Sequence, residues 1–204
     1  KPLNILLCLL RIVYGLRLGG YLAIREFRSA SYNKVLDKET TKNDDVSLGV
    51  RFAIWVAAAL LYAFMITPVL FRMQNGVAPN AAGWIGLIVM ACGIIMEAAA
   101  DVQKQNAKKS NPHRVVTTGV YSFVRCPNYL GELITWTGVL ISGIGALVGP
   151  LQWALAIIGW LGIVYVMFSG ARRFEERHNR HYQNNSEYQH YHDTVPIMIP
   201  FVPL

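Results

Sequence analysis

The sequence predicts an all-α integral membrane protein, a polytopic bundle of transmembrane helices that forms a single domain over residues 1–204. Composition is the first observation, because 53% of the residues are hydrophobic and only 15% are charged, whereas a soluble globular chain carries about 25% charged residues. Five apolar stretches are the second observation, and the distribution of Lys and Arg is the third. This composition excludes disordered, collagen-like and coiled-coil proteins.

Five stretches approach the roughly 20 apolar residues that a helix needs to cross about 30 Å of hydrocarbon. They comprise residues 3–24, 52–71, 84–100, 129–148 and 151–171. None shows the period-two alternation of a barrel strand, and residues 55–70 lack the polar stripe of a soluble bundle. Pro68 is expected to kink or end the second span. Because residue 1 is Lys rather than Met, we expect sequence upstream of it, which leaves room for a further span.

Fifteen of the 19 Lys and Arg residues lie in three connecting segments, residues 25–51, 101–128 and 172–204. With five spans, these segments fall on one side of the bilayer, and Lys and Arg concentrate on the cytoplasmic side. We therefore expect two cytoplasmic loops and a cytoplasmic tail, in a bacterial inner membrane or the endoplasmic reticulum. The net charge of +7 then reflects contact with anionic lipid or a phosphorylated cofactor rather than with nucleic acid.

Polar residues at the span ends are the candidates for chemistry. Glu132 lies inside the fourth span and Arg17 inside the first, where a charge is costly unless it faces a partner or an aqueous cavity. Glu132 could also form a structural ion pair with Arg125 or Arg17. A cationic set follows the third span, and its members could anchor the span or bind nucleotide phosphates: Lys104, Lys108, Lys109, His113 and Arg114.

Residues 119–132, GVYSFVRCPNYLGE, followed by Trp136, resemble the signature of two related groups of integral membrane enzymes. One group comprises the steroid 5-alpha-reductases and sterol reductases, with an uncharacterised bacterial branch. The other comprises the isoprenylcysteine carboxyl methyltransferases. The first span, with YGLRLGGYLAIREF, and the tail, with its Tyr-x-x-Tyr and Ile-Pro pattern, resemble the bacterial reductase-like branch. The resemblance covers most of the chain.

The reductase resemblance implies an NADPH cavity among the cytoplasmic ends of the helices. It assigns the following residues to the cofactor: Asp101, Lys108, Arg114, Tyr121, Arg125, Asn128, Glu132, Tyr188 and Tyr191.

The implied reaction reduces a conjugated carbon–carbon double bond in a lipophilic, steroid-like or other enone, with hydride from NADPH and hydrogen bonds to the carbonyl. A Tyr and a Glu polarise the carbonyl in that family, so Tyr21 is the first catalytic candidate, Tyr14 the second, and Glu132 is catalytic as well. Arg17 shares a helical stripe with Tyr21 and, together with Trp136, is assigned to the substrate. Trp136 and Tyr121 could equally be ordinary interfacial aromatic residues.

Two other functions remain open. An S-adenosylmethionine-dependent methyltransferase is suggested by Arg173 and Glu175-Glu176, although Cys126 replaces the His of that group, and S-adenosylmethionine has no phosphate for the basic loop. A non-catalytic subunit of a membrane complex is the third possibility, with protein partners unknown. No metal site is expected, because the three cysteines are far apart and the tail histidines lack a thiolate or carboxylate at matching spacing.

Overall fold

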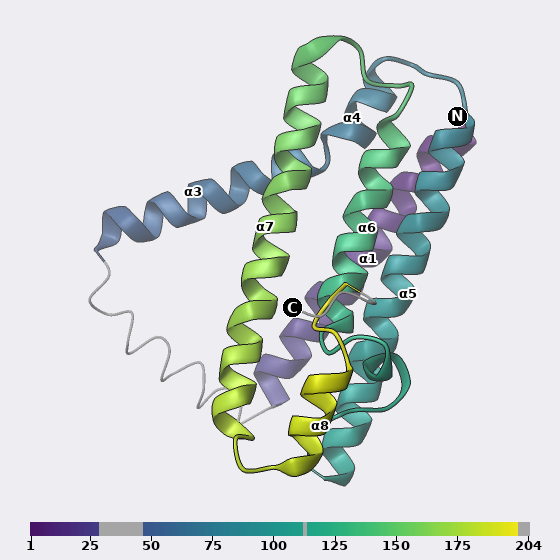
Figure 1. Ribbon diagram of the computed structural model, residues 1–204. Coiled ribbons are helices and arrows are strands. Elements are labelled where there is room, and N and C mark those ends of the chain that lie inside the picture. Colours follow the sequence, from purple (N-terminus) through teal and green to yellow (C-terminus); the bar gives the residue numbers. More distant parts are fainter. Residues whose placement is uncertain (29–46, 112–113, 200–204) are drawn as a thin grey trace.

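The computed structural model describes residues 1–28, 47–111 and 114–199 (Figure 1). Most of the loop expected at residues 25–51, His113 and the end of the tail lie outside the described residues. Across the described ranges the chain is helical and contains no strand, which confirms the all-α prediction. The helices are α1 (Pro2–Arg28), α3 (Leu48–Met65), α4 (Thr67–Gln74), α5 (Ala81–Ser110), α6 (Pro127–Gly143), α7 (Gly149–His181) and α8 (Ser186–Thr194), with a short 3-10 helix η1 (Gly119–Ser122).

Four of the described helices, α1, α3, α5 and α7, are long and apolar enough to cross a membrane. Helix α6 has 17 residues, and at 1.5 Å per residue it measures about 25 Å, somewhat less than the hydrocarbon thickness of about 30 Å. The chain is therefore an integral membrane protein. The count of five spans and the side on which the tail lies remain predictions.

The second apolar stretch is divided in two, as Pro68 predicts. Helix α3 ends at Met65, and α4 begins at Thr67 with Pro68 in its first turn, where the missing N–H of proline carries no cost. At this break α3 turns away from the bundle and projects beyond α7 (Figure 1). Most of its apolar side chains are exposed, as expected of a surface that faces lipid.

Glycines bring α5 and α6 into close backbone contact. A Cβ atom built on Gly93 of α5 would lie 2.5 Å from the carbonyl oxygen of Gly131, and one built on Gly138 of α6 would lie 2.5 Å from the backbone nitrogen of Met90. Small residues permit this approach between helices in a membrane. The contact fixes the register of the two helices and places Glu97 directly beside Gly131.

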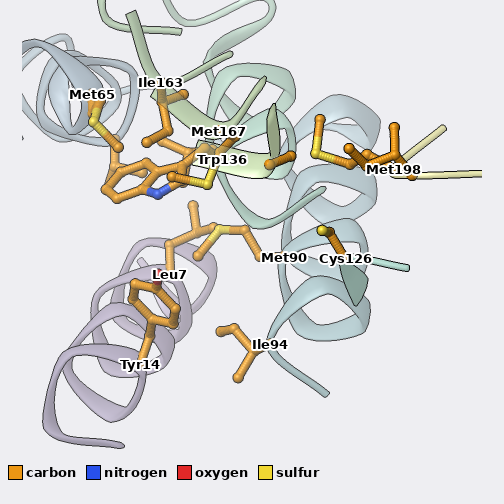
Figure 2. Close-up of a cluster of buried hydrophobic side chains, with 14 of the residues drawn as sticks. Leu7, Tyr14, Met65, Met90, Ile94, Cys126, Trp136, Ile163, Met167 and Met198 are labelled. Atoms are coloured by element: carbon orange, nitrogen blue, oxygen red, sulfur yellow. The ribbon is translucent and has the colours of Figure 1, made fainter. Parts of the chain in front are cut away.

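The apolar core lies between α1, α6 and α7. Figure 2 shows the Trp136 ring of α6 among Met65, Ile163 and Met167, with Leu7 and Tyr14 of α1 on its other side. These side chains are buried, with Trp136 only 4% exposed. The same core therefore positions Trp136 and Tyr14.

The two ends of the bundle are closed in different ways. At one end the buried Arg72 donates to the carbonyl oxygens of Ser142 and Ala78, both at 3.0 Å. At the other end α8 folds back against the ends of α5 and α7 (Figure 1), and the following strap, residues 195–199, pairs with the loop before α6. The backbone N–H of Arg125 donates to Pro196 O at 2.9 Å, and that of Cys126 donates to Ile197 O at 2.8 Å. Because α5, α7, α8 and this loop meet here, we call it the basic end.

We predict that Gly93→Ala destabilises the protein by about 1–3 kcal/mol, because the added methyl overpacks a contact that has no room for it. The free energy of unfolding in detergent measures the effect. Gly15→Ala on α1 is the matched control, since nothing lies within 4 Å of its added Cβ, and it should leave stability unchanged or slightly higher. Equal stability of the two variants would contradict the close α5–α6 contact.

Candidate functional site

A narrow pocket with a cavity volume of about 40 Å³ lies at the basic end. It is formed by the C-terminal ends of α5 and α7, by η1 and by α8. Five of the nine residues predicted to bind the cofactor line it, together with Lys104, His178 and Tyr182: Lys108, Tyr121, Arg125, Tyr188 and Tyr191. Segments distant in sequence thus bring cationic and aromatic side chains together in one pocket.

Tyrosines and a tight turn hold the pocket wall in place. Gly119 adopts a positive φ of 65°, which glycine tolerates without strain, and the next N–H, that of Val120, donates to Gln103 Oε1 at 2.9 Å. The Tyr191 hydroxyl donates to the carbonyl oxygen of Tyr121 at 2.7 Å. Burial raises the pKa of both Tyr121 and Tyr191, and raises the pKa of Tyr188 to about 12. All three phenols therefore stay protonated near neutral pH.

Arg125 joins three elements at the pocket wall. Its side chain is 6% exposed and lies 2.7 Å from Glu175 Oε1 of α7. It also donates to the carbonyl oxygens of His192 and Val195. Because its charge is matched by Glu175 and its donors are used within the protein, Arg125 organises the wall and the strap. This arrangement leaves phosphate binding mainly to other cations.

The cations of the predicted set are separated by the fold. Lys108 and Lys104 line the pocket; Lys108 Nζ donates to Arg114 O at 2.9 Å and to the Tyr182 hydroxyl at 3.2 Å. The Arg114 side chain is exposed outside this lining and pairs with Glu187 at 2.7 Å, which holds the pKa of that carboxyl below its usual range. Lys109 follows Lys108 on α5, and its side chain is exposed.

A second polar group, the inner cluster, lies deeper in the bundle between α1, α5 and α6. We define it as Arg11, Tyr14, Arg17, Glu97, Asp101, Glu132 and Trp136. Arg17 pairs with Glu97, which is only 3% exposed, and lies 3.4 Å from Asp101 Oδ2. Neither Arg17 nor Arg125 pairs with Glu132, so the structural ion pairs considered for Glu132 are not present in the described part of the chain.

Helix periodicity places three of the predicted site residues on one face of α6. Asn128, Glu132 and Trp136 follow one another at intervals of four, so they share one face of the helix. Asn128 lies half-buried in the first turn, whereas Trp136 reaches the core. The Glu132 carboxylate faces Trp136, Tyr14 and Arg11.

The structure separates the two tyrosine candidates of α1. The Tyr14 ring meets the Trp136 ring edge to face, with centroids 6.3 Å apart. Tyr21 lies seven residues further along α1, about 10 Å nearer to the basic end, where it interacts electrostatically with Tyr121. Of the two, Tyr14 is therefore the one beside Glu132.

Five atoms of the inner cluster are buried without a partner at hydrogen-bond geometry among the described residues. They are Arg11 Nη1, Tyr14 Oη, Arg17 Nε, Glu97 Oε2 and Trp136 Nε1. Buried polar atoms are normally satisfied, so this group has the donor and acceptor set of a binding site. Asp101, which pairs with Arg17, also interacts electrostatically with Tyr121 of the pocket wall, so we treat the pocket and the inner cluster as two parts of the candidate site.

Sequence reasoning missed one residue of this site, Arg11, and it named Lys104 only as a member of the cationic set, not among the nine cofactor residues. Arg11 precedes Tyr14 by three residues, which makes the two side chains neighbours on the helix surface, and this spacing to a catalytic candidate could have revealed it. Cys126, which replaces the His of the methyltransferases, is buried, and burial raises the pKa of its thiol to about 12. The thiol therefore stays protonated near neutral pH.

Together these features define a helical membrane protein with a basic pocket at one end and a buried polar cluster deeper in the bundle. The chain belongs to the family described as protein of unknown function (DUF1295), whose profile matches residues 1–195. No solved structure matches it significantly.

Curated relatives confirm the resemblance to steroid reductases. The chain is 27% identical over 121 residues to "Steroid 5-alpha-reductase DET2" of Arabidopsis thaliana, which covers 58% of this chain and 41% of that protein. It is 23% identical over 161 residues to "3-oxo-5-alpha-steroid 4-dehydrogenase 1" of Mus musculus. This match covers 70% of this chain and 57% of that protein. The chain thus spans about half the length of these relatives.

We predict that Arg125→Gln loosens the strap, because removing one partner of a buried ion pair costs roughly 3–5 kcal/mol. Hydrogen–deuterium exchange of residues 186–199 should become faster. Arg172→Gln is the control: this exposed arginine pairs with Glu176 within one helix at 3.3 Å, and such pairs contribute less than about 1 kcal/mol. Unchanged exchange in Arg125→Gln would show that the strap is held by other contacts.

Proposed function

We propose that the protein is a membrane-embedded, NADPH-dependent reductase of a conjugated carbon–carbon double bond in a lipophilic enone, steroid-like or otherwise. One observation carries the proposal: a pocket with two lysines and several aromatic rings lies at the basic end, and buried polar atoms outside hydrogen-bond geometry lie deeper in the same apolar bundle. A dinucleotide has phosphates and a flat base at one end and its reactive ring at the other. The two regions match these two ends.

The residues of the pocket fit the cofactor. Lys104 and Lys108 would hold its phosphates, and the faces of Tyr182 and Tyr188 would stack against its base. Reduced nicotinamide supplies a hydride when bound. We place the basic end on the cytoplasmic side, where the cofactor is dissolved.

The inner cluster would bind the substrate carbonyl. Tyr14 Oη and Trp136 Nε1 are buried donors outside strict hydrogen-bond geometry, and a substrate carbonyl oxygen would accept from them. Glu132 lies beside both, so it would orient the reacting groups and handle the proton. Tyr14 takes the catalytic position for which Tyr21 was the first candidate, because Tyr14 contacts Trp136 and lies beside Glu132. The surrounding apolar side chains would exclude water and receive the lipophilic body of the substrate.

We predict that NADPH, added to the protein in detergent, raises its melting temperature, whereas NADH raises it less and S-adenosylmethionine not at all. Lys104→Ala and Lys108→Ala should each weaken NADPH binding roughly 10- to 100-fold, because a charged hydrogen bond contributes about 1.5–3 kcal/mol. Calorimetric titration measures the dissociation constants.

Lys109→Ala is the matched control for these variants. It removes the same charge from the adjacent exposed position and should change the dissociation constant by less than about twofold. Stabilisation by S-adenosylmethionine alone would support a methyltransferase instead. No stabilisation by any of the three compounds would support a non-catalytic subunit.

We predict that Glu132→Gln keeps the fold but lowers turnover of a steroid 4-en-3-one about 100-fold, as expected for loss of a group that transfers protons. The amide has the same shape as the carboxylate but cannot carry its charge or its proton. Loss of NADPH absorbance measures turnover, and thermal unfolding tests the fold. A large fall in melting temperature would indicate that Glu132 is structural.

A further inference from the structure

Arg11 differs from the other interior arginines of the chain. Arg17 pairs with two carboxylates, Arg72 donates to two carbonyl oxygens, and Arg125 binds a carboxylate and two carbonyl oxygens. Arg11 makes no ion pair with a described residue, and its Nη1 atom is buried without a hydrogen-bond partner. The Glu132 carboxylate interacts with Arg11 electrostatically, but Nη1 itself has no hydrogen-bond acceptor among the described residues.

Aromatic rings hold the Arg11 guanidinium in a fixed place. Its central carbon lies 3.6 Å from the centroid of the Trp136 ring and 5.4 Å from that of Tyr14. Stacking over an aromatic face attracts a cation and restricts its orientation, but it leaves the edge N–H groups without acceptors. A buried cation of this kind is costly unless another group completes its hydrogen bonds.

The neighbouring atoms indicate which group would complete them. Tyr14 Oη and Trp136 Nε1 are also buried donors, and both interact with the Glu132 carboxylate. Arg11 Nη1 is therefore the donor of this group that is left for a further oxygen acceptor. A permanently charged carboxylate would suit the site poorly, because the inner cluster already contains three carboxyl groups and only two arginines. A neutral carbonyl oxygen, which gains negative charge only during a reaction, satisfies this donor without that repulsion.

We propose that Arg11 is a further catalytic residue, a fixed cation that contacts the carbonyl oxygen of the substrate and stabilises the enolate formed during reduction. The inference rests on the proposed function. Hydride from a reduced nicotinamide forms a C–H bond at the β-carbon, and the π electrons of the double bond shift to leave an enolate with its negative charge on oxygen. A proton from an acidic side chain or water then adds to the α-carbon, and the carbonyl is restored. Arg11 keeps its own proton throughout, and fixed charges at such a position lower the barrier.

A conjugated steroid trienone, which absorbs at longer wavelengths than protein, tests the contact without cofactor or turnover. Polarisation of its carbonyl shifts the absorption band to the red. We expect this shift when the trienone binds the wild-type chain, and its loss in Arg11→Met, with the dissociation constant changed less than about threefold. Arg11→Lys keeps the charge and should retain part of the shift. In turnover with a 4-en-3-one, Arg11→Met should lower kcat about 100-fold at nearly constant KM.

Absence of the shift in the wild-type protein, or a full shift in Arg11→Met, would overturn the proposal. If Arg11→Met does not fold, the comparison of wild type with Arg11→Lys decides, since a lysine cannot reproduce the planar stacked geometry and an identical shift would exclude the contact. Arg172→Met, at an exposed position on α7, is the control and should keep the full shift. A red shift that depends on Arg11, without any NADPH-dependent turnover, would contradict the reductase function but support the carbonyl-binding site.

Discussion

The close backbone contact between α5 and α6 is the constraint on which the rest of the site depends. Two helices with ordinary side chains pack about 8–10 Å apart, but the glycines of this interface remove the Cβ atoms that would collide. Their register is consequently fixed, because a shift along the axis would place a side chain against a backbone. Glu97 therefore lies beside Gly131, and the adjacent Glu132 faces α1 at the same depth. Without this contact, the carboxyl groups of the two helices would have no reason to share one region.

The charged side chains inside the bundle each require a partner. A buried ion is costly unless it is paired, and the chain meets this requirement by different means. Arg72 satisfies carbonyl oxygens next to the end of α6, and Arg125 satisfies those of the strap while pairing with Glu175. These two arginines close the ends of the bundle. Arg17 of α1 pairs with two carboxylates of α5, Glu97 and Asp101. These ion pairs hold α1 against α5 within the inner cluster.

Much of the architecture could be predicted from the sequence, because hydrophobicity and proline act locally. The apolar stretches and the break at Pro68 are of this kind. The partners of Arg114 and Arg125 could not be predicted, since Glu187 and Glu175 lie 73 and 50 residues away, and only tertiary packing brings them together. Tyr14 and Tyr21 are seven residues apart and share one helical face, so periodicity alone cannot separate them.

The position of α1 along α6 is what distinguishes the two tyrosines, and the core sets that position. Leu7 and Tyr14 pack against Trp136 (Figure 2), which itself lies among side chains of α3 and α7. A shift of α1 by two turns toward the other end would bring Tyr21 to Trp136, but it would also separate Arg17 from Glu97 and Asp101 and break both ion pairs. The ion pairs and the aromatic contact therefore specify the same register. The apolar core and the polar site are two consequences of a single arrangement of helices.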